Sequence, residues 1–158
     1  MLQITKRVDY ALIGLTHLAV HDGERFSARG LADAYHLSKP LMANVLKVLS
    51  KEGIVRSLRG TKGGYELVED PKALTVGRIV ELLEGPLQLA DCVGHHHDEA
   101  ACTVSSVCPV RHSVFKIHLR IRDVLYGQSI ADLARDAGRR GDSLPVVQSS
   151  TVCLESNA

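Results

Sequence analysis

The stretch DCVGHHHDEAACTVSSVCPVRH, residues 91–112, concentrates side chains that can hold a metal. It contains three of the four cysteines in the chain and four of the eight histidines. Three thiolates and one further ligand suit either an iron–sulfur cluster or a Cys3His zinc site. Structural zinc sites usually contain a C-x2–4-C knuckle, whereas the spacing here is C-x9-C-x5-C-x3-H, and its wide loops favour the bulkier cluster. The candidate ligands in this stretch are Cys92, Cys102, Cys108 and His112.

Two other uses of this stretch are possible. The run His95–His97 fits a solvated loop better than a ligand set, although it could take up a stray metal ion. Cys108 and His112 could also form the nucleophile pair of a zinc- or thiol-dependent enzyme. Such a pair needs a pocket and oxyanion donors, and the sequence indicates neither. We therefore predict that the chain is not an enzyme.

The N-terminal segment indicates in which cell compartment the protein is expected to work. Lys6 and Arg7 precede the apolar run YALIGLTHLAV, as in a signal peptide, but Thr16 and His17 interrupt it and no small-x-small cleavage site follows. No stretch approaches the roughly 18–20 apolar residues of a membrane span. We predict a cytoplasmic protein without a membrane segment, in which clustered cysteines bind metal rather than form disulfides.

Three predicted helices precede the cysteine stretch. Apolar residues at helical spacing predict a helix over 6–21. Ser27 is an N-cap for a short helix over 28–36, and Ser38 is an N-cap for a third helix that includes Pro40 and ends at Gly53. Two short helices joined by a tight turn form a helix-turn-helix unit. We expect the third helix to bury Leu41, Val45, Val48 and Leu49.

A β-hairpin and three further helices complete the predicted fold. The segment IVRSLRGTKGGYELV alternates apolar and polar residues around the tip RGTKGG, which predicts a hairpin wing. One helix follows Thr75 and ends at Gly85, a long helix over 109–126 opens at Pro109, and SIAD at 129–132 starts a short closing helix. The predicted fold is mainly α with a small β-hairpin wing: a winged helix-turn-helix domain plus a long dimerisation helix.

The long helix carries an apolar seam with alternating spacings of four and three residues, typical of a coiled coil. The seam could belong to the core, but its position beyond the winged helix favours a dimer contact. Its residues are Val110, Val114, Ile117, Ile121 and Val124. We predict a DNA-binding domain over 1–85, a cluster-binding loop over 86–108, the dimerisation helix with the closing short helix over 109–137, and a disordered Gly/Ser/Arg-rich tail over 138–158.

The helix-turn-helix and the wing lie in a basic region of the chain. Six basic residues and one acid, Glu52, fall within 39–62, although the net charge is only +1. The third helix could enter the major groove while the basic, glycine-rich wing tip approaches the backbone. A solvated face on a protein-binding module is the alternative, and the 4% aromatic content disfavours single strands or RNA. The candidate DNA-binding residues are Ser38, Lys39, Pro40, Asn44, Lys47, Arg59, Gly60, Lys62, Gly63 and Tyr65.

Taken together, these segments resemble the IscR/NsrR family of winged-helix iron–sulfur regulators, often called the Rrf-two family. The likeness rests on MLQITKRVDYAL, the capped third helix, VRSLRGTKGGYELVEDP, TVGRIVELLEGP, the three-cysteine loop and SIADL, and covers about residues 1–137. It implies a homodimeric repressor that binds a palindromic double-stranded operator through a segment near 28–51. It also implies an iron–sulfur cluster, 2Fe-2S or 4Fe-4S, held by Cys92, Cys102 and Cys108.

The fourth ligand separates two kinds of regulator in this family. Those of the IscR kind place a histidine three positions after the third cysteine, whereas His112 lies four positions after Cys108. They also lack an acid in the first helix. Those of the NsrR kind, which sense nitric oxide, have aspartate at the DYAL position, here Asp9, and there the carboxylate reaches across the dimer to the cluster. The first cysteine spacing, nine residues, is longer than in either kind.

We expect Asp9 to be the fourth ligand. The alternative is a surface acid that interacts with the helix dipole. The resemblance implies a signal of nitric oxide, redox state or iron–sulfur supply, which would act because a cluster in the loop constrains the recognition helices. The alternative function is a cluster-free regulator that responds to a partner protein or a small ligand.

Overall fold

The computed structural model describes residues 4–60, 63–90, 102, 104, 107–139 and 144–148. In these residues the chain forms six helices and one antiparallel hairpin, which confirms the predicted fold class. None of these helices is long and apolar enough to cross a bilayer. The elements are α1 (Lys6–Val20), α2 (Ala28–Ala34), α3 (Lys39–Lys51), β1 (Val55–Leu58), β2 (Gly64–Leu67), α4 (Val76–Glu84), α5 (Arg111–Gly127) and α6 (Ile130–Arg139).

Local capping explains where most of the helices begin. Ser27 Oγ accepts a hydrogen bond from Gly30 N–H at 2.9 Å, and Thr75 Oγ1 accepts one from Arg78 N–H at 3.2 Å. At α6, Asp132 N–H donates to Ser129 Oγ and Ser129 N–H donates to Asp132 Oδ2, as in a capping box. The predicted starts of these helices are therefore confirmed.

Ser38 precedes α3 as predicted, but its side chain makes no capping hydrogen bond. An N-cap oxygen accepts from the second or third helical N–H, and Pro40 at the second position has none. The Ser38 backbone N–H instead donates to Tyr10 Oη at 3.1 Å. The start of α3 is therefore fixed by a tertiary contact with α1.

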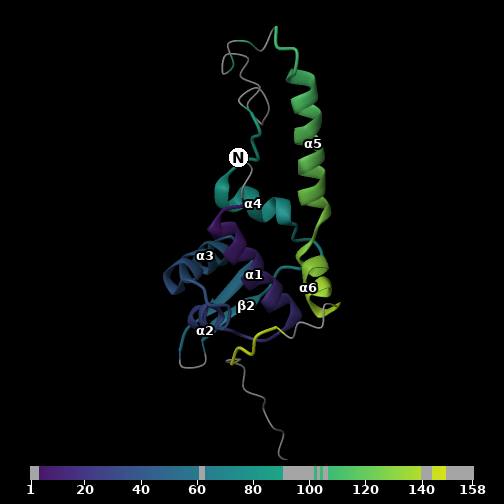
Figure 1. Cartoon of the computed structure of the whole chain (residues 1–158). Helices are drawn as coiled ribbons and strands as arrows, with labels where there is room; N and C mark the ends of the chain where they lie inside the picture. The colour runs from purple at the N-terminus through teal and green to yellow at the C-terminus, as the bar shows by residue number, and fades with distance from the viewer. Residues whose placement is uncertain are drawn as a thin grey trace, which may run out of the picture.

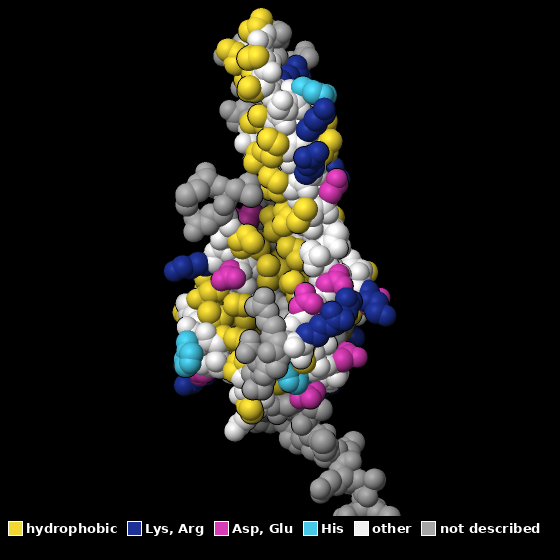
Figure 2. Space-filling view, turned by 45° about the vertical axis from the view of Figure 1, so that its right-hand side comes forward, with side chains coloured by type: hydrophobic (Ala, Val, Ile, Leu, Met, Phe, Trp, Pro, Cys, Tyr) yellow, Lys and Arg dark blue, Asp and Glu magenta, His cyan; other side chains and the backbone are white. Residues whose placement is uncertain are grey.

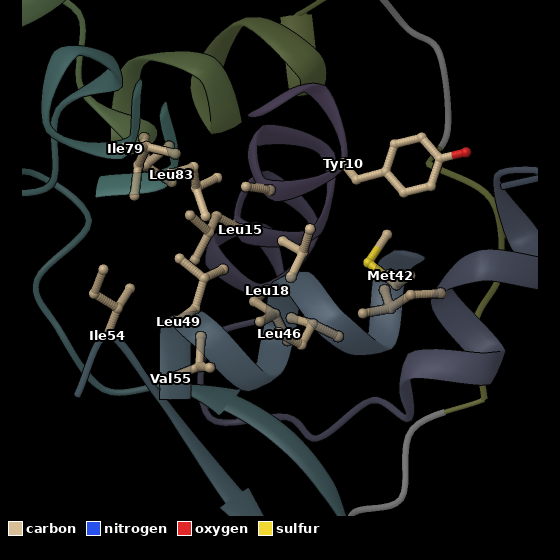
Figure 3. Packing of buried hydrophobic residues seen from close by; sticks show 14 of the residues in the cluster. Tyr10, Leu15, Leu18, Met42, Leu46, Leu49, Ile54, Val55, Ile79 and Leu83 are labelled. Atoms are coloured by element: carbon tan, nitrogen blue, oxygen red, sulfur yellow. The ribbon is translucent and has the colours of Figure 1, made fainter. Parts of the chain in front are cut away.

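The hydrophobic core lies where α1, α2, α3, α4 and α6 meet. In Figure 3, Leu15 and Leu18 of α1 point toward Leu46 and Leu49 of α3. The predicted inward face of α3 was partly wrong, because Leu41 and Val48 are only half-buried. The residues of α3 that are buried are Met42, Val45, Leu46 and Leu49, an i, i+3, i+4, i+7 stripe rotated slightly from the predicted one.

The wing is joined to the connection between α1 and α2. Strands β1 and β2 pair from Val55 opposite Leu67 to Leu58 opposite Gly64. Phe26 extends this pairing, because it exchanges two backbone hydrogen bonds with Tyr65, at 3.1 and 2.9 Å. A Cβ atom on Gly64 would lie 2.9 Å from Phe26 O, so glycine permits this close approach. The base of the wing is therefore fixed to the core of the domain.

Helix α5 projects from the rest of the molecule (Figure 1). It begins at Arg111, two residues after the predicted start, and His118 is its one buried residue. At its C-terminal end Tyr126 lies against Gly77 of α4, where a Cβ atom would be 2.5 Å from the ring. Of the predicted seam, Val110 is 56% exposed, Ile117 50% and Val124 66%. Figure 2 shows a column of hydrophobic side chains along this helix.

The C-terminal part of the chain differs from the prediction. Helix α6 extends to Arg139, beyond the predicted boundary at 137, and it packs against α1 with Ile130 fully buried. The closing helix therefore contributes to the core of the winged helix rather than only to a dimerisation unit. Within the segment predicted to be a disordered tail, residues 144–148 are described, and Val147 packs against this core. The other residues after 139 lie outside the described part.

Candidate functional site

The predicted recognition helix presents an exposed polar face. The side chains of Ser38, Lys39, Pro40, Asn44 and Lys47 are all exposed. Lys39 Nζ lies 2.7 Å from Asp33 Oδ1 of α2, so this lysine links the two helices of the unit. Asn44 and Lys47 lie on the same face of α3, about one turn apart. This face can offer hydrogen bonds to base edges and positive charge to phosphates.

Two further residues on this face were not among the predicted DNA-binding residues, although Lys51 belongs to the basic region 39–62. Ala43 and Lys51 are both exposed, and each is four positions from Lys47 along α3. Residues at i and i+4 share one side of a helix, so the periodicity could have identified them. Ala43 offers a methyl contact of the kind that thymine accepts, and Lys51 adds a charge near the C-terminal end of α3.

The tip of the wing combines a cation with glycine conformations. Arg59 is exposed, and Gly60 has φ +110°, a backbone angle that other residues rarely adopt. A Cβ atom on Gly63 would lie 2.3 Å from Leu58 O, so this position also requires glycine. Lys62 lies outside the described residues. The tip can therefore bring Arg59 close to a polyanion, because Gly60 and Gly63 add no side chains beside it.

Tyr65 occupies a different environment from the rest of the predicted DNA-binding set. Its side chain is half-buried and packs against the core, while its backbone pairs with Phe26. Arg56 is an exposed cation of the wing that belongs to the basic region 39–62 but not to the predicted DNA-binding set, and its guanidinium lies 3.1 Å from the Glu66 carboxylate. Glu66 also pairs with Arg25 at 2.8 Å. Tyr65 therefore contributes to the base of the wing, and any contact with DNA remains a prediction.

A buried histidine fixes the turn of the helix-turn-helix unit. His17 of α1 is fully buried, and its Nδ1 lies 2.9 Å from the hydroxyl of Tyr35, the C-cap residue of α2. Its ring also stacks on His21 and meets Phe26 edge-on. Burial, followed by the nearby His21, lowers the pKa of His17 to about 4, so the ring is neutral at pH 7. This contact ties the turn after Tyr35 to the first helix.

Two of the three predicted cysteine ligands fall within the described residues. Cys102 and Cys108 are half-buried, and Cys92 lies outside the described part of the chain. His112 is exposed in the first turn of α5, and Asp9 is exposed in the first turn of α1. Among the described residues, no group of three or more His, Cys, Asp or Glu side chains could hold a metal ion.

Asp9 and Cys108 lie near opposite ends of α5. Cys108 lies three residues before the first residue of this helix, whose 17 residues span about 25 Å. Near the other end, Leu125 and Val8 line the same pocket, of about 340 Å³, at the start of α1. Asp9 follows Val8 in that first turn. A single chain therefore keeps Asp9 and Cys108 about one helix length apart. The pocket is lined by Ile4, Thr5, Val8, Val80, Glu84, Gly85, Pro86, Leu87, Gln88 and Leu125.

Comparisons with known proteins agree with this architecture. The Rrf2 family model, described as an iron-dependent transcriptional regulator, matches residues 4–136. The transcriptional regulator NsrR of Geobacillus kaustophilus is 30% identical over 139 residues, which are 85% of this chain and 91% of that protein. The structure of CymR, the global cysteine regulator of B. subtilis, has a TM-score of 0.70 and 28% identity, and the match covers 86% of this chain and 98% of CymR. T. potens IscR has a TM-score of 0.68 and 29% identity, covering 90% and 93%.

Proposed function

The chain belongs to the Rrf2 family of transcriptional regulators, and we propose that it is a dimeric repressor that responds to nitric oxide, redox state or iron–sulfur supply. The proposed sensor is an iron–sulfur cluster held by cysteines of the loop between α4 and α5. Two features together support the proposal. The winged helix-turn-helix presents an exposed basic face, and the cysteine-bearing segment lies at the N-terminal end of α5, whose apolar residues are exposed.

The proposed DNA contact has two parts. Helix α3 would enter the major groove, where Asn44 and Ser38 can hydrogen-bond to base edges and Lys39 and Lys47 can approach phosphates. Arg59 and Lys62 at the wing tip would bind the neighbouring backbone. The fixed base of the wing and the His17–Tyr35 contact support this proposal, because they hold the wing and the turn in one rigid unit.

The proposed dimer uses the exposed seam of α5. Val110, Ile117 and Val124 are each at least half exposed, and a second copy of the helix would remove them from water. An antiparallel pair would place the start of one α5 beside the C-terminal end of the other. Cys108 of one subunit would then approach the partner's Asp9, which the single chain keeps about one helix length away. An isologous dimer would create two such sites.

The donor set suits iron better than a hard cation. Thiolates are soft ligands that favour iron–sulfur clusters or zinc, and the half-buried Cys102 and Cys108 offer two of the three proposed thiolates. When bound, an iron–sulfur cluster supplies a centre that reacts with nitric oxide and exchanges electrons. Asp9 in α1, rather than His112, is the proposed further ligand, and a carboxylate is the more weakly held donor on iron.

The chain itself provides a mechanical route from the loop to the DNA-binding unit. The loop leads directly into α5, the end of α5 rests on α4 through Tyr126 and Gly77, and α6 continues from it onto α1. Helix α1 in turn contacts the turn of the helix-turn-helix unit through His17 and Tyr10. We propose that a change in the position of α5 is transmitted along this route to α3.

Anaerobic purification followed by absorption spectroscopy and analysis of iron and sulfide tests this proposal. We expect a brown protein, with the colour and iron lost in the single variants Cys92→Ala, Cys102→Ala and Cys108→Ala while the folded dimer persists. Cys153, the fourth cysteine of the chain, lies outside the stretch 91–112, so Cys153→Ala is the matched control and should retain full iron. A variant at Cys92, Cys102 or Cys108 that retains its iron would exclude that residue as an essential ligand.

A second candidate function is a cluster-free regulator that responds to a partner protein or a small ligand. The structural likeness to CymR, described as a global cysteine regulator, supports this second candidate. Its signature would be a colourless, iron-free protein that still binds DNA after anaerobic purification. Zinc in place of iron would likewise leave the protein colourless, so metal analysis separates these outcomes.

A further inference from the structure

A short segment near the C-terminus lies against the helix-turn-helix unit. Residues 144–148 lie beside α2 (Figure 1), and Val147 packs against the hydrophobic core. Its contact on α2 is Gly30, where a Cβ atom would lie 3.1 Å from Val147 Cγ1. The segment lies beyond residues 4–136, which the family model matches. We propose that residues 144–148 form a strap that docks on α2 around Gly30 and holds the helix-turn-helix unit in its DNA-binding geometry.

The exposure of neighbouring side chains shows that the strap has a defined orientation. Val146 is 95% exposed, whereas Leu144, Pro145 and Val147 are half-buried. Two adjacent valines therefore differ in environment, one facing solvent and the other facing the domain. A segment without a docking surface would expose both valines alike.

Helix α2 gains from an additional contact because it is short. It has seven residues, of which Leu31 and Ala32 are buried, and isolated helices of this length are not stable in water. Gly30 lowers its helix propensity further, since glycine is a poor helix former. The absence of a side chain at Gly30 leaves the space that Val147 approaches, because an added Cβ would lie 3.1 Å from both Val147 and Ser27 Oγ.

The strap also links two parts of the domain that both pack against α1, namely α6 and the helix-turn-helix unit. Its preceding helix, α6, packs on α1 and buries Ile130 in the core. From there the chain reaches α2, which contacts α3 directly. The strap therefore adds a further connection between the C-terminal helices and the recognition helix.

Hydrogen exchange on the full-length protein tests the strap. Val147→Asp removes the docked side chain, and Val146→Asp adds the same charge at the neighbouring exposed position. We expect backbone amides of α2 to exchange about tenfold faster in V147D than in V146D, because local opening becomes easier, while α4 is unchanged. Equal exchange of α2 in the two variants would overturn the proposal.

Two further measurements keep the result unambiguous. If V147D loosens the whole domain, the near-isosteric variant V147T is used instead. Faster amide exchange confined to α2 in V147T would support the strap, and unchanged exchange of α2 would overturn it. Binding to a random-sequence DNA duplex of about 30 base pairs reads out phosphate contacts without a known operator. V147D should bind this duplex about threefold more weakly than V146D, because the helix-turn-helix unit opens more easily in V147D. Equal binding would overturn the link between the strap and DNA.

Discussion

Asp9 and His112 are alternatives for one ligand position, and the structure gives them different surroundings. His112 lies four residues after Cys108 in the same chain, whereas Asp9 lies near the far end of α5 and would need a partner subunit. We expect Asp9→Ala to change the visible spectrum of the anaerobic protein and its DNA binding after exposure to nitric oxide, with His112→Ala close to the wild type. Loss of the native spectrum in the His112 variant alone would instead favour the IscR-like assignment.

His17 predicts how stability depends on pH. Burial lowers its folded-state pKa to about 4 from the ordinary 6.5, so the unfolded chain binds more protons between these values. The free energy of unfolding should therefore fall as the pH decreases from about 6.5 toward 4, by at most about 3.5 kcal/mol at about 1.4 kcal/mol per pKa unit.

Urea unfolding of the wild type and His17→Gln measures this contribution. Glutamine can still hydrogen-bond to the Tyr35 hydroxyl but does not take up a proton. The variant should lose less stability than the wild type over this pH range. Parallel pH profiles for the two proteins would show that His17 is not the responsible group.

At the scale of elements, the wing offers a test of the DNA interface. Arg59→Ala and Lys62→Ala should each weaken DNA binding and make its salt dependence less steep, by about 0.9 in the log–log slope for each phosphate that the variant no longer neutralises. Arg135→Ala on α6 removes the same charge from another element, where the arginine pairs with Asp132. The salt-dependence slope of Arg135→Ala should match that of the wild type. An unchanged slope in both wing variants would show that the wing does not belong to the DNA interface.

The elements themselves were predictable because their signals are local. Ser27, Thr75 and the Ser129–Asp132 box mark helix starts within a few residues, and the glycines of the wing mark its turn. The inward face predicted for α3 differs from the observed one because apolar residues occupy two adjacent stripes of this helix. Packing against α1 determines which stripe is buried, and it buries Met42 and Leu46. The periodicity of the sequence alone does not distinguish between the two stripes.

Contacts between distant residues account for what the sequence did not predict. The docking of Val147, the Lys39–Asp33 pair and the Ser38–Tyr10 hydrogen bond each join separate elements. For the candidate site, residue types and spacing identified the exposed face of α3 but not Ala43 or Lys51. Asp9 and Cys108 lie apart in one chain, and no local sequence pattern defines how the proposed second subunit would bring them together.

At the scale of the whole molecule, the exposed seam of α5 predicts that the dimer depends on this helix. Ile117→Lys and Val124→Lys should each weaken dimerisation at least about tenfold, because burying an unpaired charge costs several kcal/mol. Val20→Lys is a control, since Val20 is 42% exposed on α1. Light scattering after gel filtration gives the mass. A dimer that persists in both seam variants would place the interface elsewhere.

The central claim is that a cysteine-held iron–sulfur cluster controls DNA binding, and one comparison tests it most directly. An operator selected from random DNA by the anaerobic protein would be titrated with the iron-loaded protein and with the same protein after a chelator has removed the iron. We predict Kd values that differ at least about tenfold, a coupling of about 1.4 kcal/mol, for the wild type and no difference for Cys108→Ala. Equal operator affinity of iron-loaded and iron-free wild-type protein would contradict the account.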